Sequence, residues 1–284
     1  EPRFVCNMVL FGNDASPVLD NICSIFRGTY SSANNHFTVQ FDQKSDPVAV
    51  YNNSSVENGE FNYSYVPATE LFNQIKVEYI DKFDGYRTKI DEVSDESNIA
   101  KYGLRSTSIT AFGATKRSYA LRCAKWNLVT ALTENETVTF VLGAAGIRHE
   151  QHDIIKIADN DYAGAQIGGR IESVDGNTIT VDRELKNVKE FMINIDGSVK
   201  TFPVIKAVDA KTYQLDSAVN AVDYVQFVAT LNNLEPRLFR CIHIEEDSEI
   251  NKYTVTAIKH NPQKEAIVDK GAEYIEGNHS ILNT

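Results

Sequence analysis

The stretch Thr115–Leu142, which reads TKRSYALRCAKWNLVTALTENETVTFVL, decides the fold class because it joins a helical pattern to a strand pattern. Its first part repeats apolar residues at steps of three and four, which places them on one helical face: Leu121, Ala124, Leu128 and Leu132. After a short polar turn at 134–136, every second residue over 138–142 is apolar, which is the period of a strand. The sequence therefore predicts a helix that leads directly into a strand, with Trp126, the only tryptophan, on the helix.

A second helical pattern lies near the N-terminus. Ser16 and Pro17 indicate a helix start, with the serine as cap and the proline at the first helical position. An apolar stripe follows, and Gly28 ends the predicted helix. The rest of the first half predicts strands at 3–10, 28–31, 36–41, 48–51, 72–80 and 103–109, a turn at 34–35, and a solvated loop or short helix at 91–98.

Residues 149–235 show no long helical periodicity. Short strands alternate there with turn pairs such as Asp175-Gly176 and Asp196-Gly197. This spacing predicts a small closed barrel or a sandwich. The predicted strands are 154–158, 167–174, 178–181, 191–194, 199–204, 213–215 and 225–230.

The last two predicted strands, 239–244 and 252–258, alternate and form a hairpin. We expect this hairpin to complete a sheet that 70–82 opens and 138–142 joins, so that the barrel is an insertion. The fold class is α+β, mainly β, with flanking helices and an inserted small barrel. The predicted domains are 1–68, a small α+β unit; 69–148 with 236–268, a β domain; 149–235, the barrel; and 269–284, a tail or linker.

Composition excludes several classes of protein. The chain has 284 residues, a net charge of −11 and 42% hydrophobic residues, which are typical of a folded acidic protein. An acidic chain of this kind is not expected to read nucleic acid, which needs a basic face. No apolar run of about 18 residues occurs, so no membrane span is expected. Glu1 stands at the start without Met or a basic-then-apolar leader, so we expect no signal peptide and a fragment or processed form.

Neither the cysteines nor the sequence motifs indicate a disulfide framework, a catalytic site or a cofactor site. The four cysteines are far apart and form no CxxC pair, which favours free thiols over a disulfide framework: Cys6, Cys23, Cys123 and Cys241. The sequence contains no GxSxG, HExxH or Walker A motif, and no GxGxxG motif after a strand. The glycine-rich stretch 164–169 precedes a strand, which is the wrong context for a phosphate loop. We predict no catalytic residue and no cofactor.

The most site-like cluster is Arg148–Asp153. His149, His152 and Asp153 carry the imidazole and carboxylate groups that a divalent metal accepts. Because no further ligand is fixed beside them, a polar loop entering the next strand is the favoured interpretation, and no metal site is predicted. Two other acidic clusters are weaker candidates: His243 with Glu245 and Asp247, and Asp159–Asp161, which lacks the glycine and glutamate of a calcium loop.

An aromatic cluster, Tyr51, Phe61, Tyr63 and Tyr65, leaves an alternative function open. Exposed rings of this kind would suit a β-rich carbohydrate-binding module, although packing at a strand edge is the favoured interpretation. A metal-dependent hydrolase centred on His149 and His152 is a further, weaker alternative.

The order of five segments resembles the tail tip attachment protein family of lambda-like siphophages, also called host specificity protein J. The segments are RFVCN from Arg3 with the Pro17-led helix that ends in FRG, ELFNQIKVEY from Glu70, TKRSYALR from Thr115, HDIIKIAD from His152, and YTVTAIKHNPQK from Tyr253. They are similar to family patterns in the same order and cover residues 3–269. At His152 the family usually has glycine, which puts only the local turn in doubt.

This resemblance implies a fold and a function. The family's hub domains are β-barrel-like with an OB-like insertion, here 149–235. It implies a baseplate hub that is a trimer at the distal end of the tail tube, without catalysis, with other tail-tip and tail-tube proteins as partners. It also implies a virion or prophage protein of the tail tip, assembled in the bacterial cytoplasm. The family's receptor-binding part lies beyond this region.

Overall fold

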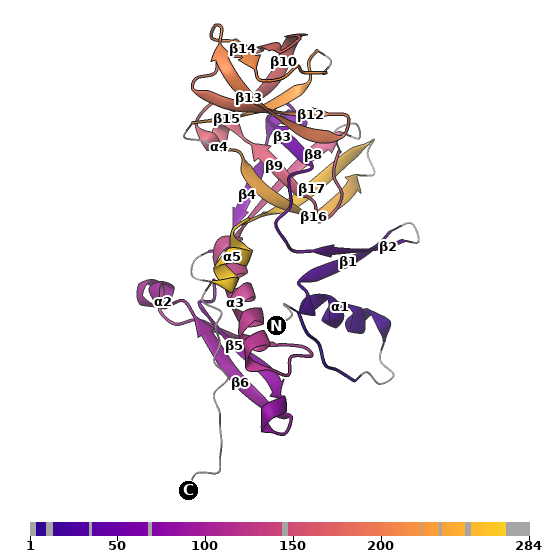
Figure 1. Cartoon of the computed structure of the whole chain (residues 1–284), viewed down its shortest axis with the longest axis vertical. Coiled ribbons are helices and arrows are strands. Elements are labelled where there is room, and N and C mark those ends of the chain that lie inside the picture. The colour runs from indigo at the N-terminus through magenta and orange to yellow at the C-terminus, as the bar shows by residue number, and fades with distance from the viewer. Residues whose placement is uncertain are drawn as a thin grey trace. The chain divides into compact units, whose positions relative to one another are not determined.

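The computed structural model of the chain describes residues 4–9, 14–33, 36–67, 70–143, 147–221, 223–232, 235–247 and 251–270. Two compact units divide the chain. Unit 1 contains residues 1–44, 66–135 and 261–284, and unit 2 contains residues 45–65 and 136–260. The chain therefore passes from one unit to the other several times, as the colours of Figure 1 show.

Unit 1 is built around the predicted helix. Helix α3, Arg117–Thr133, covers a three-stranded sheet of order β6-β5-β7. The strands are β5, Gln74–Asp81; β6, Arg87–Ser94, antiparallel to β5; and β7, Ser106–Thr110, parallel to β5. Burial alternates along β5, so Ile75, Val77 and Tyr79 face the core formed with Leu121, Ala124 and Leu128 of α3. This core buries the helical stripe that the sequence predicts.

The remaining elements of unit 1 lie at both ends of its sequence. Helix α1, Ala15–Ile25, packs against the hairpin of β1, Gly28–Ala33, and β2, His36–Phe41. Helix α2, Glu96–Tyr102, is capped by Asp95, whose carboxylate accepts from the backbone N–H of Asn98. The short elements are η2, Lys82–Asp84, and α5, Lys264–Asp269.

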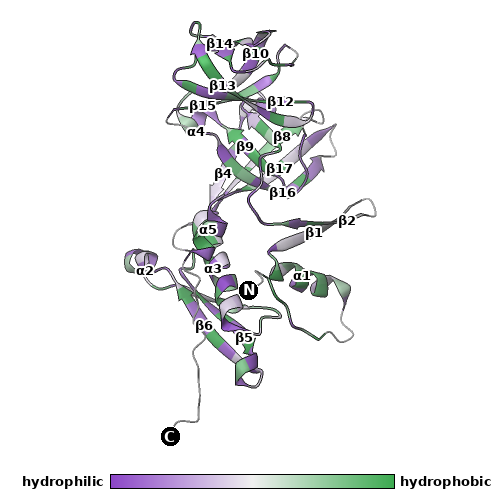
Figure 2. Ribbon diagram, in the orientation of Figure 1, coloured by the Kyte–Doolittle hydropathy of each residue, from purple (hydrophilic) through white to green (hydrophobic). Residues whose placement is uncertain are grey.

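Unit 2 contains a six-stranded sheet of order β3-β9-β16-β17-β8-β4. The pairs are antiparallel except that β3 and β9 are parallel. Its strands come from four separate parts of the sequence: β3, Ala49–Asn52, and β4, Asn62–Tyr65; β8, Glu136–Gly143; β9, Ile154–Ala158; and β16, Arg237–Asp247, with β17, Lys252–Lys259. Burial alternates along β8, which is typical of a strand with one buried face, whereas β3 is buried along its whole length and β9 along almost all of it. Figure 2 colours these strands by the hydropathy of each residue.

The second part of unit 2 is a closed six-stranded barrel. Its order is β10-β11-β14-β13-β12-β15, and its interior is filled by apolar side chains that include Phe191, Tyr213 and Phe227. The strands are β10, Gly168–Asp175; β11, Thr178–Val181; β12, Val188–Ile195; β13, Ser198–Ala207; β14, Thr212–Leu215; and β15, Gln226–Leu231. Two short helices, η1 (Glu57–Gly59) and α4 (Asn160–Ala163), complete the unit.

The mainly β fold and the small closed barrel are confirmed, whereas four local predictions are wrong. Residues 4–9 form no strand. Residues 91–94 continue β6, and only the end of the predicted 91–98 segment forms the short helix that was one of its two alternatives, α2. Helix α1 starts one residue before Ser16, with Asp14 at the cap position. Strand β8 pairs with β4 and β17, so it does not join the sheet of β5. The predicted turn at 34–35 lies outside the described residues.

The predicted domain boundaries stay a prediction. The predicted barrel domain starts at 149, but β9 within it pairs with β3 and β16 of the six-stranded sheet. Among the described residues, the four cysteines are free thiols, as expected. In that same part of the chain, none of the helices combines the length and the apolar character needed to cross a membrane.

A buried lysine connects three separate segments of unit 1. Lys264 of α5 is 1% exposed, and its Nζ lies 2.6 Å from a carboxylate oxygen of Asp42 and 2.7 Å from one of Glu134. The same ammonium lies 4.4 Å from the ring centre of Trp126, and the Arg27 guanidinium lies over that ring at 3.8 Å. Because a buried charge without a partner is strongly unfavourable, this cluster holds α5 and the residues after β2 against α3.

Replacing Lys264 by alanine should destabilise unit 1 by about 3–5 kcal/mol, because it leaves Glu134 and Asp42 without their buried cation. Trp126 lies in the cluster, so urea unfolding followed by its fluorescence measures the change at the site. The matched control is Lys125→Ala in the same unit, which removes one exposed hydrogen bond to the Lys270 carbonyl and should cost less than about 1 kcal/mol. Equal losses in the two variants would contradict the structural role given to Lys264.

Candidate functional site

The predicted metal loop at 147–153 is docked onto β16 through its backbone. The N–H of His152 donates to the Cys241 carbonyl at 2.7 Å, and the N–H of Cys241 donates to the Asp153 carbonyl at 2.9 Å. Gln151 donates from its side chain to the Ile242 carbonyl at 2.7 Å. His152 has φ = 76°, in the left-handed region that glycine adopts without strain. This geometry gives a physical reason why glycine would suit the position.

His149 is a buried, neutral histidine. It is 5% exposed, its Nδ1 lies 2.7 Å from the Tyr51 hydroxyl, and the two rings meet edge to face. Burial lowers the pKa of His149 to about 4, although the Asp153 carboxylate acts in the opposite direction. Burial also raises the pKa of Tyr51. The pair is therefore an uncharged hydrogen bond at the edge of the core, and the Nε2 atom of His149 is buried with no hydrogen-bond partner among the described residues.

The other two candidate metal ligands, Asp153 and His152, interact with neighbouring groups of the protein. The Asp153 carboxylate accepts from the N–H of Glu150 at 2.8 Å, which closes the loop into a tight turn. Burial and the nearby Arg240 lower the pKa of His152, which disfavours its charged form. Within the described part of the chain, no three His, Cys, Asp or Glu side chains gather closely enough to hold a metal ion. The prediction that this loop holds no metal remains to be tested.

The weaker candidates also have local roles. The Asp159 carboxylate caps α4 by accepting from the N–H of Asp161, and it also accepts from the side chain of Asn53. His243 and Glu245 are exposed on β16, and the side chain of Asp247 lies outside the described residues. In the glycine-rich stretch, Gly168 lies against Asn52, where a Cβ would meet the Asn52 Cβ at 2.5 Å. That glycine therefore permits a close approach of β10 to β3.

The rings of the predicted aromatic cluster pack in two separate groups, one around Phe140 and one around Tyr162. Tyr51 and Phe61 both pack on Phe140, with ring centres 5.6 and 5.3 Å away, and Tyr51 is 2% exposed. Tyr63 packs on Tyr162 at 5.1 Å. Of the four predicted rings, only Tyr65 is largely exposed, at 54%. The rings therefore do not form one exposed platform of the kind that a sugar would stack on.

Sequence reasoning missed the arginine at the centre of this second group. The Arg237 guanidinium lies 4.2 Å from the ring centre of Tyr162, 5.1 Å from that of Phe239, and makes a two-pronged ion pair with Glu136. Although the Tyr65 side chain is largely exposed, partial desolvation and a hydrogen bond with the Glu136 carboxylate raise the pKa of Tyr65 to about 12. The residues are far apart in the sequence, so no spacing pattern could have found them.

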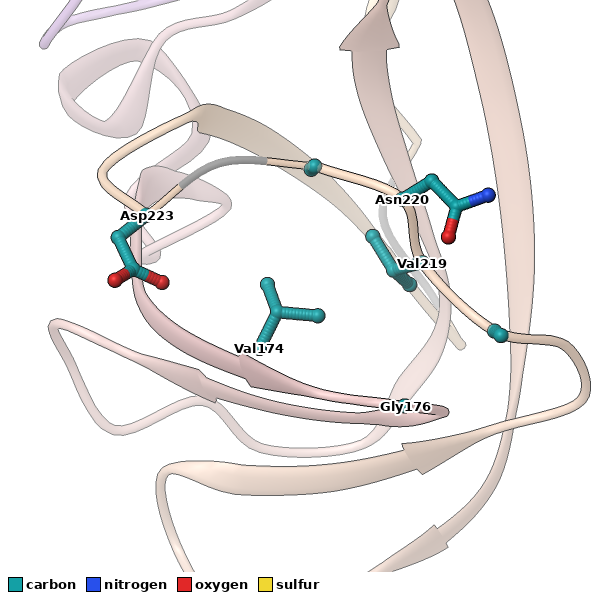
Figure 3. Close-up of a pocket in the computed structure, with 7 residues that line it drawn as sticks. Val174, Gly176, Val219, Asn220 and Asp223 are labelled. Atoms are coloured by element: carbon teal, nitrogen blue, oxygen red, sulfur yellow. The ribbon is translucent and has the colours of Figure 1, made fainter.

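The barrel has an open cavity at one end, of about 680 Å³. Figure 3 shows Val174 pointing into the opening, with Val219 and Asp223 around it, whereas the side chain of Asn220 points away. The other lining residues are Gly176, Ala218 and Ala221. One carboxylate, one amide and small apolar groups supply neither a nucleophile with its base nor a set of metal ligands.

Comparison with known proteins identifies the family to which the sequence is similar. The sequence matches the family model described as "Putative phage tail protein" over residues 14–174, which is more than half of the chain. Tip attachment protein J of Escherichia phage SECphi27 is 28% identical over 299 residues, covering 99% of this chain and 25% of the relative. Tip attachment protein J of Escherichia phage SECphi4 is 26% identical over 291 residues, and the match covers 98% of this chain and 25% of that relative. The chain spans about a quarter of the length of these curated relatives.

Among solved structures, a chain from the virion of a native gene transfer agent particle matches this chain. It has a TM-score of 0.48 and 11% sequence identity, and the match covers 87% of this chain and 39% of that chain.

The buried state of His149 makes stability depend on pH. The unfolded chain takes up a proton near the ordinary pKa of 6.5, whereas the folded chain resists it down to a pKa of about 4. The contribution of the neutral His149 to the free energy of unfolding is thus complete above pH 6.5 and falls as the pH drops toward 4. About 2 kcal/mol of that free energy is lost at pH 5. Urea unfolding at pH 7 and pH 5 measures this loss. His149→Gln cannot titrate, so an equal loss in that variant would contradict the buried, neutral histidine.

Calorimetric titration with zinc and with manganese tests the metal prediction. We expect no saturable heat, because Asp153 is engaged by the Glu150 N–H and His149 by Tyr51. A saturable heat that disappears in both His149→Gln and His152→Ala would overturn this prediction and identify the loop as a metal site.

Proposed function

The chain belongs to the family of phage tail proteins, and from this premise we propose that it is a structural part of the tail tip, forming a hub at the distal end of the tail tube. The observation that carries the proposal is the similarity to two tip attachment proteins, which extends over 98–99% of this chain. A match of that extent includes both units and not the barrel alone.

The proposed hub is a trimer. Its partners are two further copies of the chain and other proteins of the tail tip and tail tube. Its place is the virion, at the tail tip, after assembly in the cytoplasm of the bacterial host.

The proposed role is not catalytic. The histidine loop is fixed by backbone and tyrosine contacts, and the barrel opening offers a single carboxylate. These arrangements suit a structural component, because an acid–base site needs groups with access to a substrate.

The mass of the purified chain in solution tests the proposal. We expect trimers by light scattering as the concentration rises, and rings with three-fold symmetry in negative-stain images. A chain that stays monomeric at the highest concentration reached, without rings, would contradict the trimeric hub.

A further inference from the structure

Lys264 lies between two carboxylates of unit 1 at a site that largely excludes water. Its side chain is 2% exposed, that of Glu134 is 7% exposed and that of Asp42 is 20% exposed. The buried Trp126 ring lies 4.4 Å from Nζ. A buried cluster of charges is weak evidence of a purely stabilising role, because the cost of desolvation can exceed the attraction between the charges. The cluster also has the composition of a reactive site: an amine, a carboxyl group beside it and a second carboxylate to move protons.

The backbone holds all three groups in place. The N–H of Asp42 donates to the Arg27 carbonyl at 2.8 Å, directly after β2. At the start of α5, the N–H of Lys264 donates to the Asn261 carbonyl at 3.1 Å. Glu134 follows α3, and its Oε1 atom accepts from the N–H of Asn261 at 2.9 Å, whereas its Oε2 atom lies 2.7 Å from Nζ. One oxygen of Glu134 therefore faces the backbone and the other faces the lysine, which is the orientation of a general base.

Asp42 is the carboxyl group that the amine can attack. Reaction requires the two reacting atoms to lie within about 3–3.5 Å of each other. The Oδ2 atom of Asp42 lies 2.6 Å from Nζ, so the carboxyl carbon is one covalent bond beyond that contact. Joining an amine to a carboxyl group releases water, and a site that excludes water protects the resulting amide from hydrolysis.

We propose that Lys264 and Asp42 form an intramolecular isopeptide bond, with Glu134 as the group that relays the protons. The Lys264 ammonium gives one proton to Glu134, and the neutral amine attacks the Asp42 carboxyl carbon. A bond forms between Nζ and Cγ, and the bond between Cγ and one oxygen of Asp42 breaks. Nζ then loses a second proton, and both protons leave with that oxygen as water. An ammonium and a carboxylate become an amide and water, so atoms and charge balance without an oxidant or a cofactor.

The bond ties the segment after β2 to α5, and the two joined residues are 222 positions apart. It restricts the unfolded chain as a disulfide of the same span does, and the four cysteines of this chain are free thiols. The reaction occurs once in each chain and uses no external substrate, so it is compatible with a structural role. The ion pair is the state before the reaction. The inference does not depend on the proposed hub.

Intact mass spectrometry of the purified, denatured chain tests the bond. We expect the wild-type mass to be lower than that of the sequence by one water molecule, and digestion to release a branched peptide that joins residues 42 and 264. Glu134→Gln keeps the shape of the side chain and loses the base, so it should keep the full mass. Lys264→Arg keeps the cation but supplies no amine, so it should also keep the full mass. A wild-type chain at the full mass would overturn the inference, even where a variant fails to fold.

Lys89 is a matched control within the same chain. It also contacts two carboxylates, Asp81 at 2.9 Å and Asp84 at 3.4 Å, but its side chain is 33% exposed. We expect no branched peptide at Lys89, because water has access to this group. A branched peptide at Lys89 would overturn the role given to burial and to Glu134. A link from Lys264 to Glu134 would overturn the choice of Asp42 as the reacting carboxyl group.

Discussion

Two buried carboxylates in one short turn impose the constraint on which both units depend. Glu134 follows the end of α3, Glu136 is the first residue of β8, and they are 8% and 2% exposed. A buried ionised carboxylate is strongly destabilising without a partner, and each of these has a cationic partner far along the chain. Glu134 pairs with Lys264 in unit 1, and Glu136 pairs with Arg237 in unit 2. The return of two distant segments, one to each unit, is therefore fixed by electrostatics as well as by strand pairing.

The sequence could predict what local periodicity determines. Helix α3 and strand β8 follow directly from apolar residues at helical and then alternating spacing. The barrel strands follow in the same way, because Asp175-Gly176 and Asp196-Gly197 mark the turns between them. These features depend on residues within a few positions of one another, so that one sequence without further information is sufficient. The buried face of β5 is a third example, since its side chains alternate in and out.

What the sequence could not predict depends on contacts between distant residues. The polar turn at 134–136 is typical of a solvated loop, and the distant Lys264 and Arg237 pair with its two buried glutamates. His149 was a candidate ligand because its chemistry allows it, yet Tyr51 and the surrounding core keep it neutral. The predicted pairing of β8 was also wrong. Alternation of apolar residues shows that a strand forms, but it does not show which sheet or which neighbouring strand it joins. In each case a tertiary contact overrides a local preference.

The internal ion pairs leave the acidic surface of the chain nearly unchanged. Lys264 and Arg237 are matched by the carboxylates of Asp42, Glu134 and Glu136, so burial removes similar amounts of both signs. The excess of negative charge therefore remains at the surface, where it keeps copies apart at distances up to the screening length.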